Sequence, residues 1–157
     1  MLAIVLGVVL GVAAPSYAAC VGTACDNKNP ETEGCSSNGL STPRESFLDS
    51  GKYTLQLRKS SGCRAAWARV VRDDQAAGTC PVLFVRVEQQ KYQNVDGSWY
   101  WVTVRVRNKA GSNGGCTGAT WSYMAPNESD RHRACFATAW STTPPSSGWR
   151  CTSYDAS

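Results

Sequence analysis

Histidine is almost absent from this sequence, and several local patterns that carry enzyme chemistry are missing. His132 is the only histidine, and the residues beside it are two arginines, with no carboxylate to orient its ring for a catalytic triad. We interpret it as a satisfied surface histidine. No Gly-x-Ser-x-Gly segment marks a nucleophilic serine, and the glycine-rich stretch 111–115 lacks the Lys-Ser/Thr pair of a phosphate-binding loop. The serine hydrolase and nucleotide-binding classes are therefore disfavoured.

The cysteines also lack the spacing of metal ligands. No Cys-x-x-Cys pair occurs, and none of the cysteines stands at ligand spacing from His132, which argues against a zinc site and a thioredoxin-like redox motif. We expect no metal and no cofactor. An even number of cysteines in an exported chain predicts disulfides instead, here four. The eight are Cys20, Cys25, Cys35, Cys63, Cys80, Cys116, Cys135 and Cys151. We expect the first three to be bridged partly among themselves, and Cys80 to pair with Cys116.

Long apolar runs are limited to the N-terminus. Residues 2–14 carry no charge, but a helix of this length spans only about 20 Å, short of the roughly 30 Å hydrocarbon core of a membrane. Small residues at Ser16 and Ala18 then form a signal-peptidase site. We therefore predict a signal peptide over residues 1–18 and a secreted protein that begins at Ala19, either free or associated with the cell wall, without stable membrane insertion.

Two alternatives to cleavage remain open, an uncleaved membrane anchor and a lipoprotein acylated at Cys20. The second has Tyr17 where a lipoprotein signal favours leucine. Because the usual basic segment before the apolar run is missing, we expect the true start of the precursor to lie upstream.

The charge balance is mild. Sixteen basic residues against twelve acidic ones give a net charge of +4, too little for a dedicated nucleic-acid binder. This balance suits work near anionic cell-wall polymers, and an ordinary soluble surface explains it equally well. Only 42% of the residues are hydrophobic, so we expect disulfides to supply much of the stability.

Period-two alternation of apolar and polar residues predicts several short strands. They cover residues 52–58, 64–71, 81–90, 99–107, 119–124 and 133–140. The segment 64–71 fits a short helix as well, and the Asp96-Gly97 pair predicts a hairpin turn. The predicted fold is mostly β, a small disulfide-stapled antiparallel β-barrel or sandwich in one domain, residues 19–157. Around it we expect an irregular lobe at 19–42, an inserted hairpin at about 80–116 and a loop tail at 141–157.

Several short motifs give the chain a resemblance to a known family. They are Cys20–Cys25 (CVGTAC), Asn29-Pro30, Gly34-Cys35, Thr54–Arg58 (TLQLR), Cys63–Arg69 (CRAAWAR), Tyr123-Met124 and Arg133–Cys135. Together they resemble DUF2690, an actinobacterial family of unknown function. The resemblance implies a secreted or surface-exposed protein and offers no catalytic residues to carry over. The section between Cys80 and Cys116 and the tail with Cys151 depart from the shorter members.

Carboxylates offer a weak case for hydrolysis or calcium binding. Two acids about 5–9 Å apart can hydrolyse a glycoside, and the candidates are Glu31 with Glu33, Asp73 with Asp74, and Glu88. The two pairs lie in polar loops where nothing would raise a pKa. Oxygen donors also occur at every second position from Asn27 to Glu33, but they do not match an EF-hand, and a turn closed by an Asn side chain explains them better.

The strongest candidate for a functional surface is one face of the strand 99–107. If Tyr100 and the valines that alternate with it face the core, the other face carries an aromatic-to-basic stripe. That predicted stripe consists of Trp99, Trp101, Thr103, Arg105 and Arg107, with Phe84 and Arg86 added by the neighbouring strand. Indoles stack on sugars or apolar protein surfaces, and arginines pair with carboxylate or phosphate. The alternative is that both faces are buried in a sandwich, or that the N-terminal lobe covers the tryptophans.

Three functions follow in order of preference. The first is a secreted, non-catalytic interaction module whose partner is an extracellular protein or a cell-wall polysaccharide. The second is a secreted inhibitor or toxin-complex component, because disulfide-locked loops make rigid ligands for enzyme clefts. The third is a small hydrolase that uses carboxylates. The sequence does not predict the oligomeric state.

Overall fold

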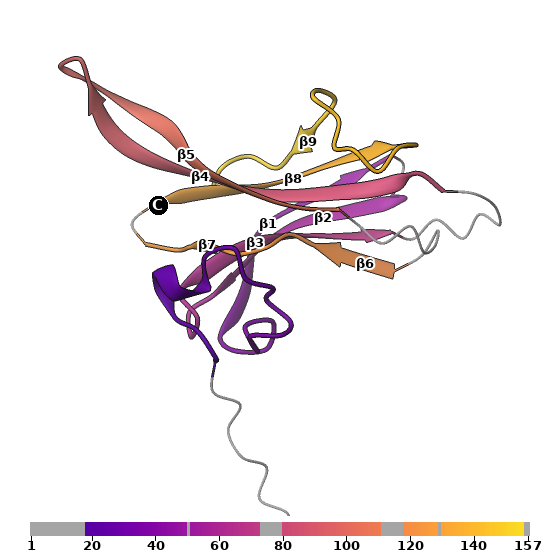
Figure 1. Cartoon of the computed structure of the whole chain (residues 1–157), viewed down its shortest axis with the longest axis horizontal. Helices are drawn as coiled ribbons and strands as arrows, with labels where there is room; N and C mark the ends of the chain where they lie inside the picture. Colours follow the sequence, from indigo (N-terminus) through magenta and orange to yellow (C-terminus); the bar gives the residue numbers. More distant parts are fainter. Residues whose placement is uncertain (1–17, 50, 73–79, 111–117, 129, 156–157) are drawn as a thin grey trace, which may run out of the picture.

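Two antiparallel β-sheets form the body of the protein (Figure 1). This computed structural model describes residues 18–49, 51–72, 80–110, 118–128 and 130–155. The first sheet has the order β1-β2-β3-β6, with β7 also paired to β3; its strands are β1 (Leu40–Leu48), β2 (Tyr53–Ser60), β3 (Ala65–Arg72), β6 (Gly118–Trp121) and β7 (Ala125–Pro126). The second has the order β5-β4-β8-β9; its strands are β4 (Val82–Val95), β5 (Ser98–Ala110), β8 (Arg131–Ala139) and β9 (Arg150–Cys151). The prediction of a mostly β, antiparallel fold is confirmed.

The apolar positions of the alternating strands meet between the two sheets. From the first sheet, β2 and β3 supply Tyr53, Leu55, Leu57, Ala66, Ala68 and Val70, and from the second, β4 and β8 supply Leu83, Val85, Val87, Ala134 and Phe136. Tyr53 and Phe136 bring their ring centroids to 5.2 Å. This shared core explains the period-two pattern, since alternate residues of each of these strands face the other sheet.

The strand β3 is buried on both faces, which explains why its sequence was ambiguous. Ala66 and Ala68 face the core, whereas Ala65 and Trp67 belong to a second apolar cluster under the N-terminal lobe (residues 18–39). Strands covered on both sides read as nearly continuous apolar runs. The segment is therefore a strand, and the helical alternative was wrong.

The N-terminal lobe is irregular apart from the short 3-10 helix η1 (Gly22–Cys25). One disulfide, Cys20–Cys25, lies within the lobe, in agreement with the prediction, and a second, Cys35–Cys63, ties it to the turn between β2 and β3. Main-chain hydrogen bonds join it to the segment before β7 (Asn27 N to Met124 O, 2.9 Å). The lobe was predicted to end at residue 42, but it ends three residues earlier, because β1 already begins at Leu40.

The C-terminal tail is mostly loop, as predicted, and the disulfide Cys135–Cys151 fixes β9 beside β8. Cys80 is also disulfide-bonded, but its predicted partner Cys116 lies outside the described residues, as do residues 1–17 of the predicted signal peptide. Among the described residues, no helix has the length and apolarity needed to cross a membrane.

The hairpin of β4 and β5 is longer than the strand that supports it. β4 pairs with β8 only as far as Gln90, and the last registered pairs, from Lys91 with Val102 to Val95 with Ser98, join β4 and β5 alone. We call this projecting part, residues 91–102, the arm; it extends past the rest of the molecule in Figure 1. Its tip is the predicted turn, in which Asp96 and Gly97 have φ of 52° and 82°, the positive pair that a type I′ turn needs.

Candidate binding surface

A β-bulge divides the predicted stripe of β5 between two faces. Gln89 is paired with Arg105, but the next residue, Gln90, is paired with Thr103, so Val104 is an extra residue in β5. An extra residue exchanges the faces of all side chains beyond it. Trp99 and Trp101 therefore lie on the outer face of the second sheet, away from the core. Arg105 and Arg107 lie on the inner face, and the prediction of one shared face was wrong.

The aromatic residues of the prediction and Arg86 differ in how far they are exposed. Arg86 is on the outer face and partly exposed, whereas Phe84 is only 1% exposed and contributes no surface. Tyr100, expected in the core, is 56% exposed because the arm passes beyond the opposite sheet. Trp99 is 57% exposed and Trp101 half-buried, so the alternative that both tryptophans are buried is wrong.

Nine side chains make a continuous line of contacts over the outer face of the second sheet, and we call this line the ladder. In order they are Trp99, Tyr92, Trp101, Arg131, Tyr154, Arg133, Glu88, Arg86 and Trp149. At the arm end, Tyr92 lies 5.4 Å from Trp99 and 5.3 Å from Trp101 between ring centroids. The Arg131 guanidinium follows at 4.1 Å from the Trp101 ring and 4.8 Å from the Tyr154 ring.

The body end of the ladder is held by ion pairs. Glu88, which is 4% exposed, accepts from Arg133 at 2.6 Å and from Arg86 at 2.5 Å, and Arg86 lies 3.9 Å from the Trp149 ring centroid. Tyr154 also donates to Glu88 at 3.3 Å, and burial raises the pKa of its phenol. The ladder thus attaches the C-terminal tail to the sheet and presents a rigid base for the arm.

The alternation around His132 predicts part of the ladder, and the prediction from the strand 99–107 did not include it. Arg131 and Arg133 flank His132, so in a strand they must lie on the face opposite the histidine. We predicted a strand only from residue 133, which left this alternation out. The aromatic partners of the arginines, Tyr154 and Trp149, come from a loop tail in which no periodicity predicts a position.

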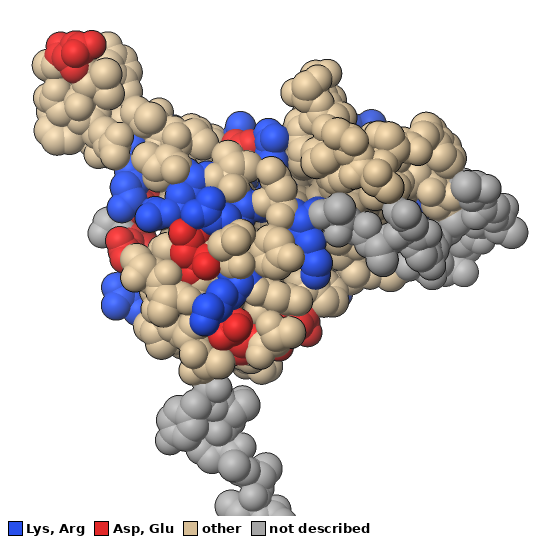
Figure 2. Space-filling model, in the orientation of Figure 1, with Lys and Arg blue, Asp and Glu red and all other residues tan. Residues whose placement is uncertain are grey.

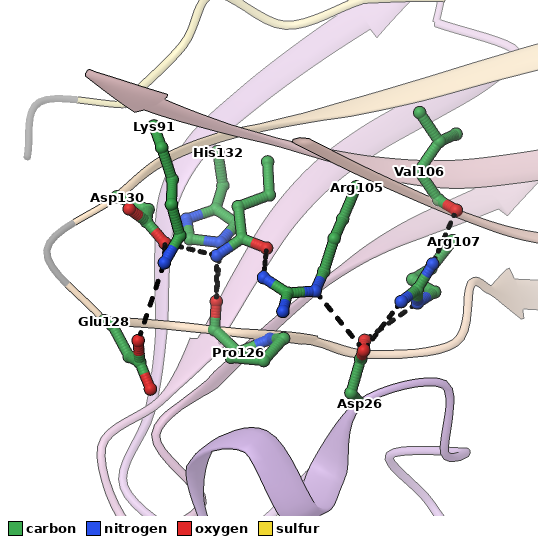
Figure 3. Close-up of polar contacts among 10 residues, drawn as sticks. Asp26, Lys91, Arg105, Val106, Arg107, Pro126, Glu128, Asp130 and His132 are labelled. Carbon is green, nitrogen blue, oxygen red and sulfur yellow. Dashed lines mark hydrogen bonds and ion pairs between the residues drawn. The ribbon is translucent and has the colours of Figure 1, made fainter. Parts of the chain in front are cut away.

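The inner face of the same hairpin carries a polar seam. It comprises Glu128, Lys91, Asp130, Gln89, Arg105, Asp26 and Arg107 (Figure 3). Gln89 is its buried centre, since its side-chain amide donates to Asp130 and to the Pro126 carbonyl, and its oxygen accepts from Arg105 at 3.0 Å. Figure 2 shows the corresponding band of basic side chains, with carboxylates among them, between the sheet that bears the arm and the N-terminal lobe.

The seam fastens the N-terminal lobe to β5 through Asp26. Arg107 binds both carboxylate oxygens, at 2.8 and 2.6 Å, and Arg105 approaches at 3.4 Å. The hydrogen bonds from Arg107 lower the pKa of Asp26, and those same bonds raise the pKa of Arg107. Because Arg105 and Arg107 lie on the inner face and are paired with Asp26, they do not belong to a stripe on the outer face.

We expect Asp26→Asn to lower the free energy of unfolding by about 1 kcal/mol, because the pair is bidentate but partly exposed. The lowered pKa places this contribution above pH 4, and it disappears as the pH falls through the folded pKa of Asp26. Urea unfolding at low salt measures it. Glu128→Gln is the control, because Glu128 meets Lys91 at 3.8 Å in an exposed pair, and it should change little. Equal effects of the two substitutions would contradict the assignment.

His132 is buried, contrary to the prediction of a surface histidine. It is 0% exposed, and its Nε2 donates to the Pro126 carbonyl at 2.9 Å, since a carbonyl can only accept. Burial, together with the nearby charge of Lys59, lowers the pKa of His132 to about 4. The ring is therefore neutral at pH 7.

Among the described residues, the carboxylates of the hydrolase hypothesis have different surroundings. Glu31 is exposed, Glu33 lies 3.7 Å from Lys28, and Glu88 is engaged with arginines; Asp73 and Asp74 lie outside the described part of the chain. The predicted turn at Asn29 is confirmed, because its Oδ1 accepts from the Glu31 amide at 3.1 Å. That oxygen also accepts from Trp121 Nε1, which joins the lobe to β6.

The fold and the site define a disulfide-linked protein of two antiparallel sheets with a projecting aromatic hairpin. Residues 23–136 match the family described as "Protein of unknown function (DUF2690)". The match covers most of the chain, and the protein belongs to this family, as its motifs predicted. No curated protein and no solved structure matches the chain. The matched region includes the arm, whereas the whole C-terminal tail, residues 141–157, lies beyond it.

Proposed function

We propose that this protein is a non-catalytic binding module that engages its partner through the arm. The observation that carries the proposal is the exposure of large apolar side chains on a hairpin that projects from the body. Tyr92, Val95, Trp99 and Tyr100 are each 43–57% exposed, and both faces of the arm contribute. Exposed apolar groups gathered on one projecting element are typical of an interaction site.

The body of the protein supports such a role by holding the arm rigidly. The ladder braces one side of its base and the polar seam braces the other, so little conformational entropy is lost on binding. We infer that the two sheets form a β-sandwich, on the basis of their common core. The arm would then be an extension of one sandwich edge.

We further propose that the module works outside the cell, after removal of the predicted signal peptide. The disulfides Cys20–Cys25, Cys35–Cys63 and Cys135–Cys151 support this proposal, because such bonds persist in oxidising compartments. The family resemblance suggests an actinobacterial source. A cell-wall polysaccharide and a secreted protein are the two partner classes that this location provides.

Retention of the oxidised protein on actinobacterial cell walls and on immobilised secreted proteins tests the proposal. We expect the wild type to be retained on one of them, and the triple substitution Tyr92→Ser, Trp99→Ser, Tyr100→Ser to weaken retention by roughly tenfold or more. The matched control is the double substitution Phe47→Ser and Trp140→Ser. These two aromatic residues lie outside the arm and are 71% and 74% exposed, so the double variant should bind as well as the wild type. No retention of the wild type, or equal loss in the control, would overturn the proposal.

An inhibitor of an extracellular enzyme is the second candidate. The feature that favours it is the narrow tip, a two-residue turn with Val95 and Ser98 paired directly beneath it. A rigid hairpin of this kind can enter a catalytic cleft. If the wild type inhibits a secreted hydrolase and the triple substitution abolishes that inhibition, the inhibitor function is favoured over binding to a cell wall or a non-enzyme partner.

A further inference from the structure

We infer that one face of the arm, formed by Trp99, Tyr92 and Trp101, is a platform for a neutral polysaccharide chain. This inference rests on the proposed function and names the ligand of the same site. The three rings form an unbroken aromatic strip, with neighbouring centroids 5.4 and 5.3 Å apart. Trp99 and Tyr92 are more than half exposed, so ring faces and edges are available to a ligand.

The neighbours of the strip suit sugar hydroxyl groups. The strand register places Gln90 and Thr103 on the same face at one end of the strip and Asn94 on that face at the other end. Gln90 donates to Thr103 at 3.2 Å, and the Asn94 side chain accepts from the Gly97 amide at 2.9 Å. Amides and hydroxyls offer both donors and acceptors of hydrogen bonds. A sugar ring needs both, because its faces are apolar and its rim carries hydroxyl groups.

Charge on the arm selects a neutral ligand over an anionic one. The arm has two charged residues, Lys91 at its base and Asp96 at its tip. The Lys91 ammonium is engaged on the inner face, 3.6 Å from Asp130 and 3.8 Å from Glu128, and Figure 2 shows the acidic tip. The nearest basic group of the ladder, Arg131, is held between Trp101 and Tyr154 and donates to Gln90 at 2.9 Å. An acidic tip repels anionic polymers and anionic headgroups.

The same tip argues against insertion into a bilayer. Entry of the arm by its tip would take the Asp96 carboxylate into an apolar medium, which is costly for an unpaired charge. A chain that lies along the side of the arm meets the aromatic strip and leaves Asp96 in water. The geometry of the arm therefore favours lateral contact with a polymer.

Depletion of the oxidised protein by insoluble polysaccharides tests the inference. The probes are chitin and cellulose as neutral chains, a polygalacturonate gel as an anionic chain, and vesicles that contain anionic phospholipid. We expect binding to a neutral chain that changes little between about 0.05 and about 0.5 M salt, since uncharged contacts are not screened. Binding only to polygalacturonate or only to the vesicles would overturn the inference.

Substitutions on the arm and away from it locate the contact. Trp99→Ser should raise the Kd for the neutral polysaccharide by roughly tenfold or more, and Trp99→Tyr should restore most of the affinity. Trp140→Ser is the matched control, because Trp140 is a tryptophan that is 74% exposed away from the arm, and the Kd of this variant should stay within about twofold of the wild-type value. Thermal unfolding of each variant checks that the fold is intact. Equal losses for the two positions would overturn the assignment of the contact to the aromatic strip.

Failure of this inference can be told from failure of the proposed function. If no neutral polysaccharide depletes the protein while secreted proteins still retain it through the arm, the platform is wrong and the binding module stands. If neither kind of partner is bound through the arm, both are wrong.

Discussion

Replacement of Trp67 with alanine is expected to lower the free energy of unfolding by about 3–5 kcal/mol. Trp67 is 1% exposed and lies in the cluster that also contains the four cysteines of the two lobe disulfides. Removal of the indole leaves a cavity. The lobe cannot easily move in to close it, because the disulfide Cys35–Cys63 fixes the distance between the lobe and the first sheet. The loss should therefore fall near the upper end of this range.

Chemical unfolding of the oxidised protein, followed by far-ultraviolet circular dichroism, measures the effect. Trp140→Ala is the matched control, since Trp140 is 74% exposed and its truncation should change the free energy by less than about 0.5 kcal/mol. A loss below about 1 kcal/mol for Trp67→Ala would show that the lobe does not seal this face of β3.

Acidification from pH 7 to pH 5 is expected to cost the protein about 2 kcal/mol of stability through His132 alone. In the folded state its pKa is lowered to about 4, chiefly by burial and then by Lys59; Asp155 and Asp130 oppose this only in part. Protonation would also create a donor at Nδ1, which is buried without a hydrogen-bond partner.

The direction of this pH dependence follows from the pKa of His132 in the unfolded and the folded protein. An unfolded histidine has a pKa of about 6.5 and takes up a proton below that pH, whereas the folded ring does not until about pH 4. Protons therefore bind the unfolded chain preferentially, and stability falls as the pH drops from about 6.5 towards 4.

His132→Gln isolates this contribution, because a glutamine can still donate to the Pro126 carbonyl and does not titrate. The sequence has one histidine, so no other histidine contributes between pH 5 and 7. Urea unfolding at the two pH values should give a difference of about 2 kcal/mol for the wild type and a much smaller one for the variant. The same pH dependence in both proteins would mean that the buried histidine is not its source.

The strands that border the core were predictable because one face of each is apolar. β1 was missed for the opposite reason, since it is an edge strand with mostly exposed residues and a register shift between Ser41 and Arg44, where Pro43 lies. Proline cannot donate to a ladder of hydrogen bonds and is tolerated at edges and bulges. Such a strand is defined by its partner β2 and carries no pattern of its own.

The candidate site was predictable in kind and only partly in its residues. Trp99, Trp101 and Arg86 do lie on one outer face, and that face is aromatic and basic. Arg105 and Arg107 were assigned to it because strict alternation was assumed through Val104, where the bulge occurs. A bulge depends on the pairing of two strands, so the periodicity of one strand cannot reveal it.

The length of the arm likewise depends on pairing. Whether the exposed tryptophans belong to a core or a surface is decided by where β8 begins, at Arg131, and by how far β4 continues beyond it. The alternating pattern is the same in both cases. That the hairpin is an insertion relative to shorter family members stays a prediction.

The most direct test that the arm is the binding surface is a hydrogen-exchange measurement. The oxidised protein is compared free and bound to the cell-wall material or secreted protein on which it is retained. We predict that binding slows exchange in residues 91–102, whose outer strand β5 has an edge without a strand partner among the described residues, and leaves the N-terminal lobe and β1 unchanged. Protection confined to the lobe or to the first sheet, with the arm unaffected, would contradict it.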